Sequence, residues 1–344
     1  MKEAATIYTL AEELGMTPSM VSRALNPNGK VAPEKRQLVL DAAQKHHFVP
    51  NRFASRLSRR QVKVGVLLYV KAEHVLEQML AGLKRAYGRN RDYKVEYTIK
   101  VIRCTEKEVT ECEKDLMELV RCDGVILAGF SKAECTEMIR RFLTINPNVV
   151  FLQNVCEETD YLFASKHNEE LASHMAAELL GNRLYYKARK NILLFTGDIG
   201  SSVHRRASAA FRRYCKDYGL ELLDAVDMHD SEEFLREQIR SIMKQYEGLV
   251  DGIYITSGNS VELCRYLREK KLDIGLVTFD VYEHLCEFIE DGTICATIFQ
   301  NIAMQAERAF DKLVAHLIEG ELPQKTEYTE VTAVMRNNLA LYRE

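Results

Sequence analysis

The sequence predicts a chain of two parts: a small all-α head and a larger α/β body with two doubly wound parallel sheets. Three short helical patterns lie within residues 9–46, and two series of apolar, β-rich runs alternate with amphipathic segments after residue 62. The two parts also differ in charge. Residues 1–60 hold ten Lys or Arg and five Asp or Glu, so their net charge is +5. The whole chain carries −3, so the remaining residues carry −8, the difference between these values. A basic head on an acidic body favours a polyanionic partner for the head.

Length and composition exclude several classes of protein. A chain of 344 residues is long enough for two or three domains. No apolar run reaches the roughly 18 residues that a membrane span needs, and the acidic residues of the first fifteen positions are unlike a secretory signal. The nine cysteines lack CxxC or metal-ligand spacing. We therefore expect reduced thiols, a cytoplasmic protein, no membrane contact, and no metal or cofactor.

Three helices are expected in the head. The first covers Thr9–Leu14 and ends at Gly15, which can adopt the left-handed conformation. The second covers Pro18–Leu25, with Thr17 as its cap and Asn26-Pro27-Asn28-Gly29 as its end. The third covers Pro33–His46 and starts after Ala32, a residue that cannot cap it. The residues expected to face inward are Leu10, Ala11, Leu14, Met20 or Val21, Ala24, Leu25, Leu38, Val39, Ala42 and Ala43.

Two short helices joined by a tight turn with glycine are typical of a helix-turn-helix, whose second helix can enter the major groove of DNA. A plain three-helix bundle would show the same three patterns. Helix count alone does not separate these two interpretations.

The body alternates buried strands with helices. Continuous Val, Ile and Leu runs bounded by helical segments are typical of parallel strands covered on both faces. The first series of strands is expected at residues 62–70, 93–102, 123–129 and 148–154. The second series is expected at residues 191–197, 220–226, 251–258, 273–280 and 292–299. Two series predict two lobes, and ligands of such sheets bind beyond the carboxyl ends of the strands.

The N-terminal motifs resemble the DNA-binding head of the lactose-repressor (LacI-type) family. The resemblance covers Thr6–Ser58 and is carried by A-E-x-x-G, V-S-R-x-x-N and F-V-P-N-x-x-A-x-x-L. It implies that the second helix reads double-stranded operator DNA. It also implies that Ser22 and Asn26 contact phosphate or close the turn, and that Tyr8 contacts the DNA backbone. The implied groove-facing residues are Thr17, Pro18, Ser19 and Arg23. The fork of Arg23 suits guanine, whereas Pro18 departs from the usual polar residue and offers no side-chain hydrogen bond.

Residues 50–61 are expected to form a hinge. The segment is short and basic, and an isolated helix of this length is marginal in water. The family resemblance implies a hinge helix that folds on operator DNA, with Leu57 wedged between base steps in the minor groove. The residues implied in this contact are Asn51, Ala54 and Leu57. An ordinary flexible linker with a chance leucine is the alternative.

The body also resembles this family and the periplasmic sugar-binding proteins that share its sensor fold. The carriers are GVLLYV, CDGVILAG, DGIYITSGNSVELC, VTFD and DGTICATIFQNIAMQAERAF. The resemblance implies a periplasmic-binding-protein-like body of two lobes joined by three crossings, with the strand after the Asp-Gly turn at 291–292 returning to the first lobe. The expected domains are a head at 1–49, a hinge at 50–61 and a body at 62–344. Within the body, the expected lobes are 62–160 with 293–325, and 161–292 with 326–344.

Polar residues at strand ends are the candidates for effector binding. Asp280 ends VTFD, where the resemblance implies an aspartate that accepts hydrogen bonds from ligand hydroxyls. Gly258-Asn259 stands where an Asn-Asp pair is usual, and Arg205 or Arg206 stands near the family's arginine. The full set is His74, Asn154, Arg205, Arg206, Asn259, Asp280 and Gln300. A convergence of such side chains suits a polyol, and the arginines leave a sugar acid or sugar phosphate open beside a neutral sugar.

The sequence therefore predicts a homodimeric repressor of transcription that is controlled by a small-molecule effector such as a sugar. The dimer is expected to bind a pseudo-palindromic operator with half-sites about one helical turn apart. It is not expected to be an enzyme, because no phosphate-binding loop or nucleophile elbow is present in the sequence. A sugar receptor or an α/β sugar-metabolising enzyme are the alternatives, and either would leave the basic head unexplained.

Overall fold

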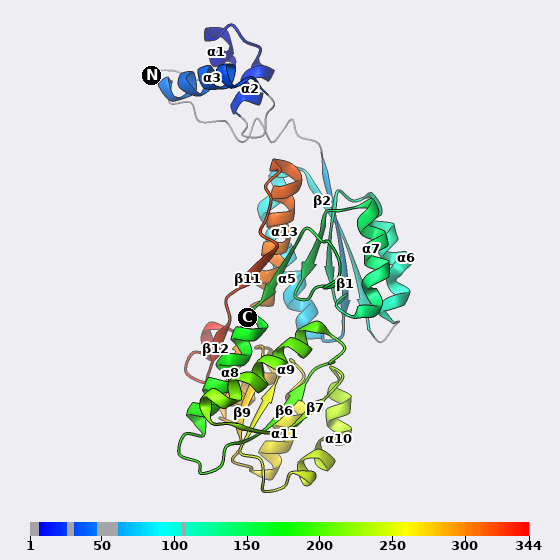
Figure 1. Cartoon of the computed structure of the whole chain (residues 1–344), viewed down its shortest axis with the longest axis vertical. Helices are drawn as coiled ribbons and strands as arrows, with labels where there is room; N and C mark the ends of the chain where they lie inside the picture. The colour runs from blue at the N-terminus through cyan, green and yellow to red at the C-terminus, as the bar shows by residue number, and fades with distance from the viewer. Residues whose placement is uncertain (1–6, 26–30, 47–60, 105–107, 344) are drawn as a thin grey trace.

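The computed structural model describes residues 7–25, 31–46, 61–104 and 108–343. Three helices form the head: α1 (Ile7–Glu13), α2 (Pro18–Leu25) and α3 (Pro33–Lys45) (Figure 1). Their small core consists of Leu10, Ala11, Val21, Ala24, Val39 and Ala42. The expectation that Leu38 faces inward is wrong, because 53% of this residue is exposed and Val39 takes the inward position.

The start of α2 follows the expected capping pattern. The backbone N–H of Met20 donates to Oγ1 of Thr17 at 3.3 Å, and Pro18 occupies the first helical position. Ala32, which precedes α3, makes no such side-chain hydrogen bond. Residues 50–60 of the expected hinge at 50–61, with Asn51, Ala54 and Leu57, lie outside the described residues, as does Asn26.

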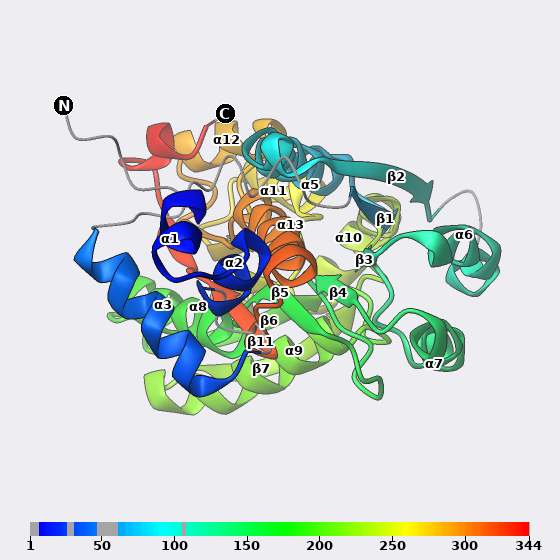
Figure 2. The same ribbon diagram turned by 90° about the horizontal axis from the view of Figure 1, so that it is seen from above.

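The first lobe is built on a parallel sheet with strand order β11-β5-β4-β3-β1-β2. The strands are β1 (Val62–Val70), β2 (Val95–Arg103), β3 (Gly124–Ala128), β4 (Val149–Leu152), β5 (Phe163–His167) and β11 (Thr326–Thr329). Seen from above, α6 (Glu113–Glu118) and α7 (Thr136–Ile145) lie on one side of this sheet (Figure 2). The other side is covered by α5 (Glu73–Asn90) and α13 (Ile302–Glu319).

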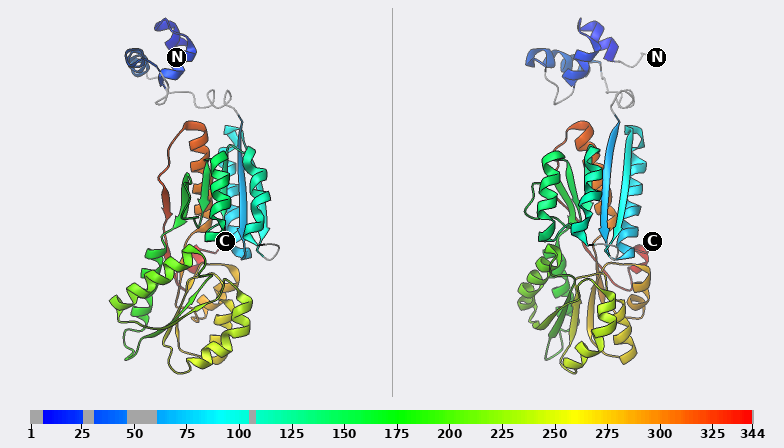
Figure 3. Two further views of the ribbon diagram at one scale, coloured as in Figure 1. Left: turned by 45° about the vertical axis from the view of Figure 1, so that its right-hand side comes forward. Right: turned by 90° about the vertical axis from the view of Figure 1, so that its right-hand side faces the viewer.

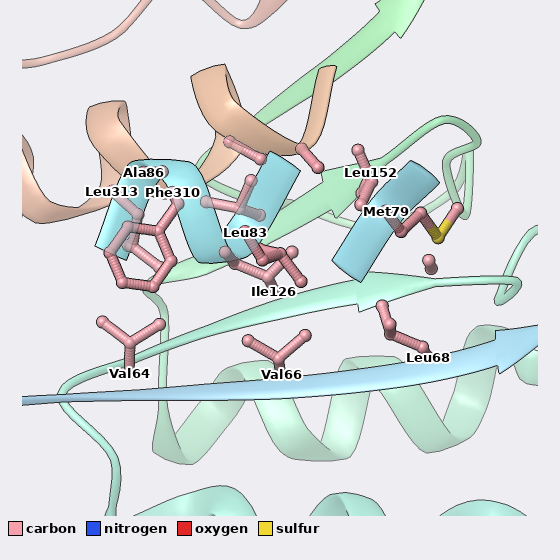
Figure 4. Close-up of a cluster of buried hydrophobic side chains, with 14 of the residues drawn as sticks. Val64, Val66, Leu68, Met79, Leu83, Ala86, Ile126, Leu152, Phe310 and Leu313 are labelled. Carbon is pink, nitrogen blue, oxygen red and sulfur yellow. The ribbon is translucent and has the colours of Figure 1, made fainter. Parts of the chain in front are cut away.

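The alternation of side chains along β1 explains why helices cover both faces. Val64, Val66 and Leu68 point toward α5 and α13, where they meet Leu83 and Phe310 (Figure 4). Residue Leu67 points to the opposite face and joins the core under α6 and α7. A run of apolar residues without polar alternation therefore has a partner on each face, as the sequence predicts for a doubly covered strand.

The second lobe repeats this architecture, with strand order β12-β10-β9-β8-β6-β7. The strands are β6 (Asn191–Thr196), β7 (Glu221–Asp227), β8 (Gly252–Ile255), β9 (Gly275–Phe279), β10 (Ala296–Phe299) and β12 (Thr332–Val334). Only the pairing of β12 with β10 is antiparallel among the strand pairs of the described residues. The helices are α8 (Glu169–Arg183), α9 (Ser202–Tyr214), α10 (Glu232–Gln245), α11 (Val261–Lys270) and α12 (Glu283–Glu290).

The chain crosses between the lobes three times, at residues 167–169, 299–302 and 329–332. Three of the expected lobe assignments are wrong. The segment 326–329, expected in the second lobe, is β11 of the first sheet and pairs with β5. The strand at 292–299 does not return to the first lobe, because β10 pairs with β9 of the second sheet and only α13 returns. The segment 163–167, expected in the second lobe, is β5 of the first sheet. Side views show the two lobes stacked end to end (Figure 3).

Candidate functional site

A cavity of about 190 Å³ lies between the two lobes, and we call it the interlobe cavity. Its walls come from the carboxyl ends of strands in both sheets, where ligands of doubly wound folds bind. The first lobe contributes residues that follow β1, β2, β3 and β4, together with the end of β5. The second lobe contributes residues that follow β6, β7, β8, β9 and β10.

The two lobes touch around this cavity. Nζ of Lys71 donates to the carbonyl oxygen of His229 at 2.7 Å, and the hydroxyls of Ser131 and Ser201 lie 2.9 Å apart. Lys132 of the first lobe forms an ion pair with Asp198 of the second at 2.9 Å. These contacts join opposite walls of the cavity, so the two lobes are in direct contact around it.

Asp280 is the most deeply buried acidic group of the cavity wall. It follows β9, and its backbone N–H donates to the carbonyl of Ile298 at 2.8 Å, which fixes it beside β10. Nε2 of Gln300 donates to Oδ2 of Asp280 at 2.8 Å, while Oδ1 has no partner among the described residues. Burial raises the pKa of this carboxyl to about 7, although the bond from Gln300 opposes the shift.

A second acidic group, Asp230, is paired with a histidine. Nε2 of His204 lies 3.2 Å from Oδ2 of Asp230, and Nδ1 of His204 lies 3.1 Å from Oγ1 of Thr256. Burial by itself would lower the pKa of His204, but the Asp230 carboxylate more than offsets it and the pKa is raised. Burial would raise the pKa of Asp230, but the histidine holds it below its usual value. Each partner of the pair thus favours the charged form of the other.

Two further histidines line the cavity in neutral form. Burial lowers the pKa of His74 and of His167 to about 4 in each case. His167 ends β5 at the first crossing, and its ring lies 5.3 Å from that of Phe279. His74 lies in the first turn of α5 and stacks on Tyr282 of the other lobe, with 4.0 Å between ring centroids.

Five of the seven residues that the sequence analysis assigns to the effector lie on this wall: His74, Asn154, Asn259, Asp280 and Gln300. Besides Asp280 and Gln300, which are bonded to each other, two more are engaged with their own lobe. Oδ1 of Asn154 accepts from the N–H of Gly129 at 3.1 Å, and Nδ2 of Asn259 donates to Oγ of Ser257 at 3.2 Å. Ligand contact by these five residues stays a prediction.

Arg205 and Arg206 are not among the residues that line the cavity. Nη2 of Arg206 donates to Oε1 of Glu169 at 2.9 Å, and its Nη1 is bonded to Glu157. Lys166 also donates to Oε1 of Glu169, at 2.7 Å. We call Glu157, Lys166, Glu169 and Arg206 the hinge cluster. These acids draw the arginines away from the cavity, so the structure gives no support to their role as ligand contacts.

The sequence analysis missed several polar residues of the wall. Among them, His204 and Asp230 form the charged pair described above, and Lys71 and Lys132 reach across from the first lobe. Most of these residues follow directly on a strand or open the next helix. A search of every residue after a predicted strand would have found Lys71 and Asp198, whereas Asp230 lies three residues beyond its strand.

In the head, the groove-facing candidates form an exposed polar surface. Thr17, Pro18, Ser19 and Arg23 are exposed, while Val21 and Ala24 on the other side of α2 are buried. Ser22 is exposed as well, and Tyr8 on α1 is 74% exposed. The surface is accessible to a partner, and the role of each residue in DNA contact stays a prediction.

Comparison with known proteins identifies the body. Residues 64–322 match the family described as periplasmic binding protein domain, and the chain belongs to this family. The fold and the interlobe cavity are those of a two-lobed binding protein. No described helix is long and apolar enough to cross a membrane.

Curated relatives extend the likeness to transcription regulators of the lactose-repressor type, as the motifs predict. The chain is 25% identical to the HTH-type transcriptional regulator pepR1 of Lactobacillus delbrueckii subsp. lactis over 66% of this chain and 65% of that protein. It is 23% identical to the lactose operon repressor of Escherichia coli (strain K12) over 96% of this chain and 89% of that protein. The match to the first of these relatives thus spans somewhat less than two thirds of its length.

Solved structures share the fold at low identity. A solute-binding protein from Burkholderia graminis C4D1M in complex with D-arabinose has a TM-score of 0.74 at 18% identity, over 83% of this chain and 99% of that one. The lac repressor dimer bound to operator and the anti-inducer ONPF has a TM-score of 0.66 at 20% identity. That match covers 96% of this chain and 98% of the other, so it includes the head as well as the body.

Proposed function

We propose that this chain is a cytoplasmic, DNA-binding repressor of transcription whose affinity for its operator is controlled by a sugar bound in the interlobe cavity. The observation that carries the proposal is the union of two parts in one chain. A head with an exposed polar α2 face precedes a two-lobed body whose interlobe cavity is lined by apolar, polar and charged residues. A regulator needs both parts, whereas a sugar receptor or a sugar enzyme has no use for the first.

The head is proposed to act as a helix-turn-helix. The α2 helix carries its polar residues on the surface, and Nε of Arg23 donates to the carbonyl of Ser19 at 3.3 Å, the one hydrogen bond of its side chain among the described residues. A guanidinium held by a single backbone carbonyl can exchange that bond for a bidentate bond to guanine. Lactose-repressor-type relatives support this assignment, because the alignment with the lactose operon repressor includes the head.

The body is proposed to couple effector binding to DNA binding in a homodimer. Bonds such as the one from Lys71 to His229 join the two lobes around the cavity. A ligand held by both lobes changes the balance between open and closed arrangements, and the first lobes of a dimer would transmit that change through residues 50–61 to the heads. The coupling free energy needed for a five- to 150-fold change in operator affinity is about 1–3 kcal/mol.

Selection of DNA from a random library by the full-length chain tests the proposal. We expect a pseudo-palindromic site with half-sites about one helical turn apart. Arg23→Ala should relax the preference at one position of each half-site by about 1–3 kcal/mol, as measured by fluorescence anisotropy with matched and mismatched duplexes. The control variant Lys35→Ala removes an exposed cation of α3 and should leave the base preference unchanged.

Two results would contradict the proposal. An unenriched library would show that the head does not read sequence and would favour a sugar receptor. An enriched site whose affinity does not respond to any small molecule that binds the body would show that the cavity does not control the head.

A further inference from the structure

Two adjacent tyrosines project from the second lobe at the end opposite the interlobe cavity. Tyr185 is 67% exposed and Tyr186 is 96% exposed, in the segment that joins α8 to β6. This segment lies at the amino end of a strand, whereas the cavity lies beyond the carboxyl ends of the strands. Because the lobes are stacked end to end, that end of the second lobe points away from the first (Figure 3).

The segment holds both rings in a defined position. Leu184, which precedes them, is buried in the core of the second lobe and anchors the turn. The two rings meet edge to face, with 4.9 Å between their centroids and 90° between their planes. Nζ of Lys190 lies 5.7 Å from the centroid of the Tyr185 ring, within the range of a cation–π contact. Side chains that are already ordered lose little conformational freedom when a partner covers them.

Two neighbouring loops extend this surface. Nη2 of Arg189 donates to the carbonyl that precedes Leu249, at 3.1 Å, and so ties the loop after α10 to the tyrosine segment. Arg183 pairs with Asp273, the residue after Leu272, at 2.7 Å and ties down the loop after α11. Both leucines are exposed. Two tyrosines and two leucines thus share one exposed surface, whereas apolar residues scattered singly would need no explanation.

This surface is basic although the body is acidic. Residues 183–190, 247–251 and 270–273 carry charges of +4, −2 and +1, a net of +3, whereas the body carries −8. Asp273 pairs with Arg183 and Lys187, but no ion pair of Arg189 or Lys190 is found within the part of the chain that the structure describes. Two cations beside exposed apolar groups are therefore accessible to an acidic partner.

The charge also separates one class of occupant from the others. In a two-fold contact with a second copy, the basic surface would face itself and be repelled. A DNA duplex is typically held through about six to ten phosphates, whereas this surface offers two unpaired cations on a body that repels a long polyanion. A short acidic protein segment needs only those two cations, and its apolar side chains can cover the tyrosines. Tyrosine and arginine are also the residue types that contribute most to protein interfaces.

We propose that Tyr185, Tyr186, Arg189 and Lys190, which we call the tyrosine patch, bind an acidic segment of a protein partner. Carboxylates of the segment bind the two cations, and its apolar side chains pack on the two rings. The proposal does not rest on the proposed function, because the patch belongs neither to the head nor to the wall of the cavity. A partner bound here is additional to any effector and to DNA.

Selection of peptides by the full-length chain tests the proposal. The probe is a library of short random peptides displayed on phage, from which binders of the double variant Tyr186→Ala with Arg189→Glu are first removed. This variant keeps the head and the cavity, so peptides that bind those parts are removed with it. We expect the peptides that remain to be enriched in Asp and Glu and to include apolar residues. No enrichment, or enriched peptides without acidic residues, would overturn the proposal.

Fluorescence anisotropy with one enriched peptide measures the contribution of each side chain. We expect Tyr186→Ala and Arg189→Glu each to weaken the affinity for the peptide by about tenfold or more. The controls are Tyr328→Ala and Arg212→Glu, which alter an exposed tyrosine of β11 and an exposed arginine of α9. These two variants should bind the peptide as the wild type does. Equal losses in the patch variants and the controls would overturn the proposal, because the peptide would then respond only to the charge and folding of the whole chain.

Two further probes test the other classes of occupant. They are a single-stranded oligothymidylate and vesicles of phosphatidylcholine with phosphatidylserine. We expect each probe to bind the wild type and the double variant equally, because any binding then comes from other parts of the chain, such as the basic head. A loss of about tenfold in the double variant would assign the patch to a nucleic acid or a membrane and would overturn the proposal. Operator selection with the double variant measures the regulator proposal separately, since the head is unchanged.

Discussion

The hinge cluster and the cavity wall at Asp280 use buried acids in opposite ways. In the hinge cluster, Glu169 is 4% exposed and receives bonds from both Lys166 and Arg206. At the cavity wall, Asp280 is 2% exposed and receives a single side-chain bond, from an uncharged amide. A buried carboxylate with two cations is a structural element, whereas one without a cation is open to a ligand.

The pKa values of Glu169 and Asp280 are shifted in opposite directions. Burial acts to raise the pKa of Glu169, but the interactions with His167, Lys166 and Arg206 together more than offset it and leave the pKa lowered. No such offset exists at Asp280, where burial raises the pKa. The comparison teaches that the buried acid of the hinge cluster is balanced by cations in contact with it, whereas the buried acid Asp280 of the cavity wall is not.

The largest expected effect on stability comes from removing the shared carboxylate of the hinge cluster, at Glu169. Glu169→Ala leaves Lys166 and Arg206 without their shared carboxylate, and Lys166 is only 5% exposed. We expect the free energy of unfolding to fall by about 3–5 kcal/mol, the usual cost of removing one partner of a buried ion pair. Urea denaturation followed by circular dichroism measures it.

The neighbouring residue provides the control for that prediction. Glu170 lies in the same turn of α8 as Glu169 and pairs with Arg213 of α9, but both side chains of this pair are more than half exposed. Glu170→Ala should cost no more than about 1 kcal/mol. Equal losses in the two variants would show that the hinge cluster is no more than a surface ion pair.

The second effect, at Asp280, depends on pH. The folded carboxyl keeps its proton up to about pH 7, while the carboxyl of the unfolded chain loses it near the ordinary aspartate value of 3.8. Folding is therefore penalised increasingly as the pH rises from 3.8 to 7, and fully above pH 7. Asp280→Asn removes this penalty and should raise the free energy of unfolding by about 1–3 kcal/mol at pH 8, with little change at pH 4.

Asparagine is the appropriate replacement because the backbone of Asp280 has a φ of +65°, a conformation that asparagine tolerates. Thermal denaturation of both proteins at pH 4 and pH 8 makes the comparison. A stabilisation of the same size at both pH values would mean that the Asp280 carboxyl is ionised at neutral pH, contrary to the structure.

Most of the architecture follows from the sequence. The apolar runs at 62–70, 123–129 and 191–197 all form buried strands, because continuous Val, Ile and Leu residues need cover on both faces. The strand at 163–167 escaped detection, since FASKH lacks such a run. It is buried through its neighbours: β4 pairs with one side of it and β11, more than 150 residues away in the chain, with the other.

The candidate site was partly predictable for a similar reason. Asp280 and Gln300 follow predicted strands, and the rule that parallel sheets bind ligands at strand carboxyl ends places them together. The hinge cluster was not predictable in this way. Whether Arg206 faces the cavity depends on Glu157 and Glu169, which come from the loop after β4 and the start of α8. Long-range pairing of charges leaves no pattern in the local sequence.

A third prediction concerns the paired acid of the cavity wall. Since Asp230 has a lowered pKa, its contribution to stability is present above the ordinary aspartate value of 3.8 and is lost as the pH falls further. Since His204 has a raised pKa, its contribution is present below 6.5 and is lost as the pH rises through the raised value. Asp230→Asn should therefore destabilise the fold most near pH 5–6, by about 1.5 kcal/mol, and less at pH 9.

Thermal denaturation at pH 5.5 and pH 9 measures the difference, with His204→Gln as the companion variant. If the pair acts as a unit, the double variant should be no less stable than the less stable single variant. Additive losses would indicate that each side chain is stabilised by other neighbours and would weaken the contrast with Asp280.

The smallest effect on the free energy of unfolding is expected for an exposed ion pair of the cavity wall. Lys132 and Asp198 join the lobes across the cavity, but 37% of the lysine side chain is exposed. Lys132→Gln should lower the free energy of unfolding by no more than about 0.5 kcal/mol, because exposed ion pairs contribute little. The effect on stability should also shrink in 1 M NaCl, where charges are screened within about 3 Å. A fall in the free energy of unfolding as large as that of Glu169→Ala would show that this ion pair, rather than the hinge cluster, holds the lobes together. The contrast between the hinge cluster and the cavity wall would then be wrong.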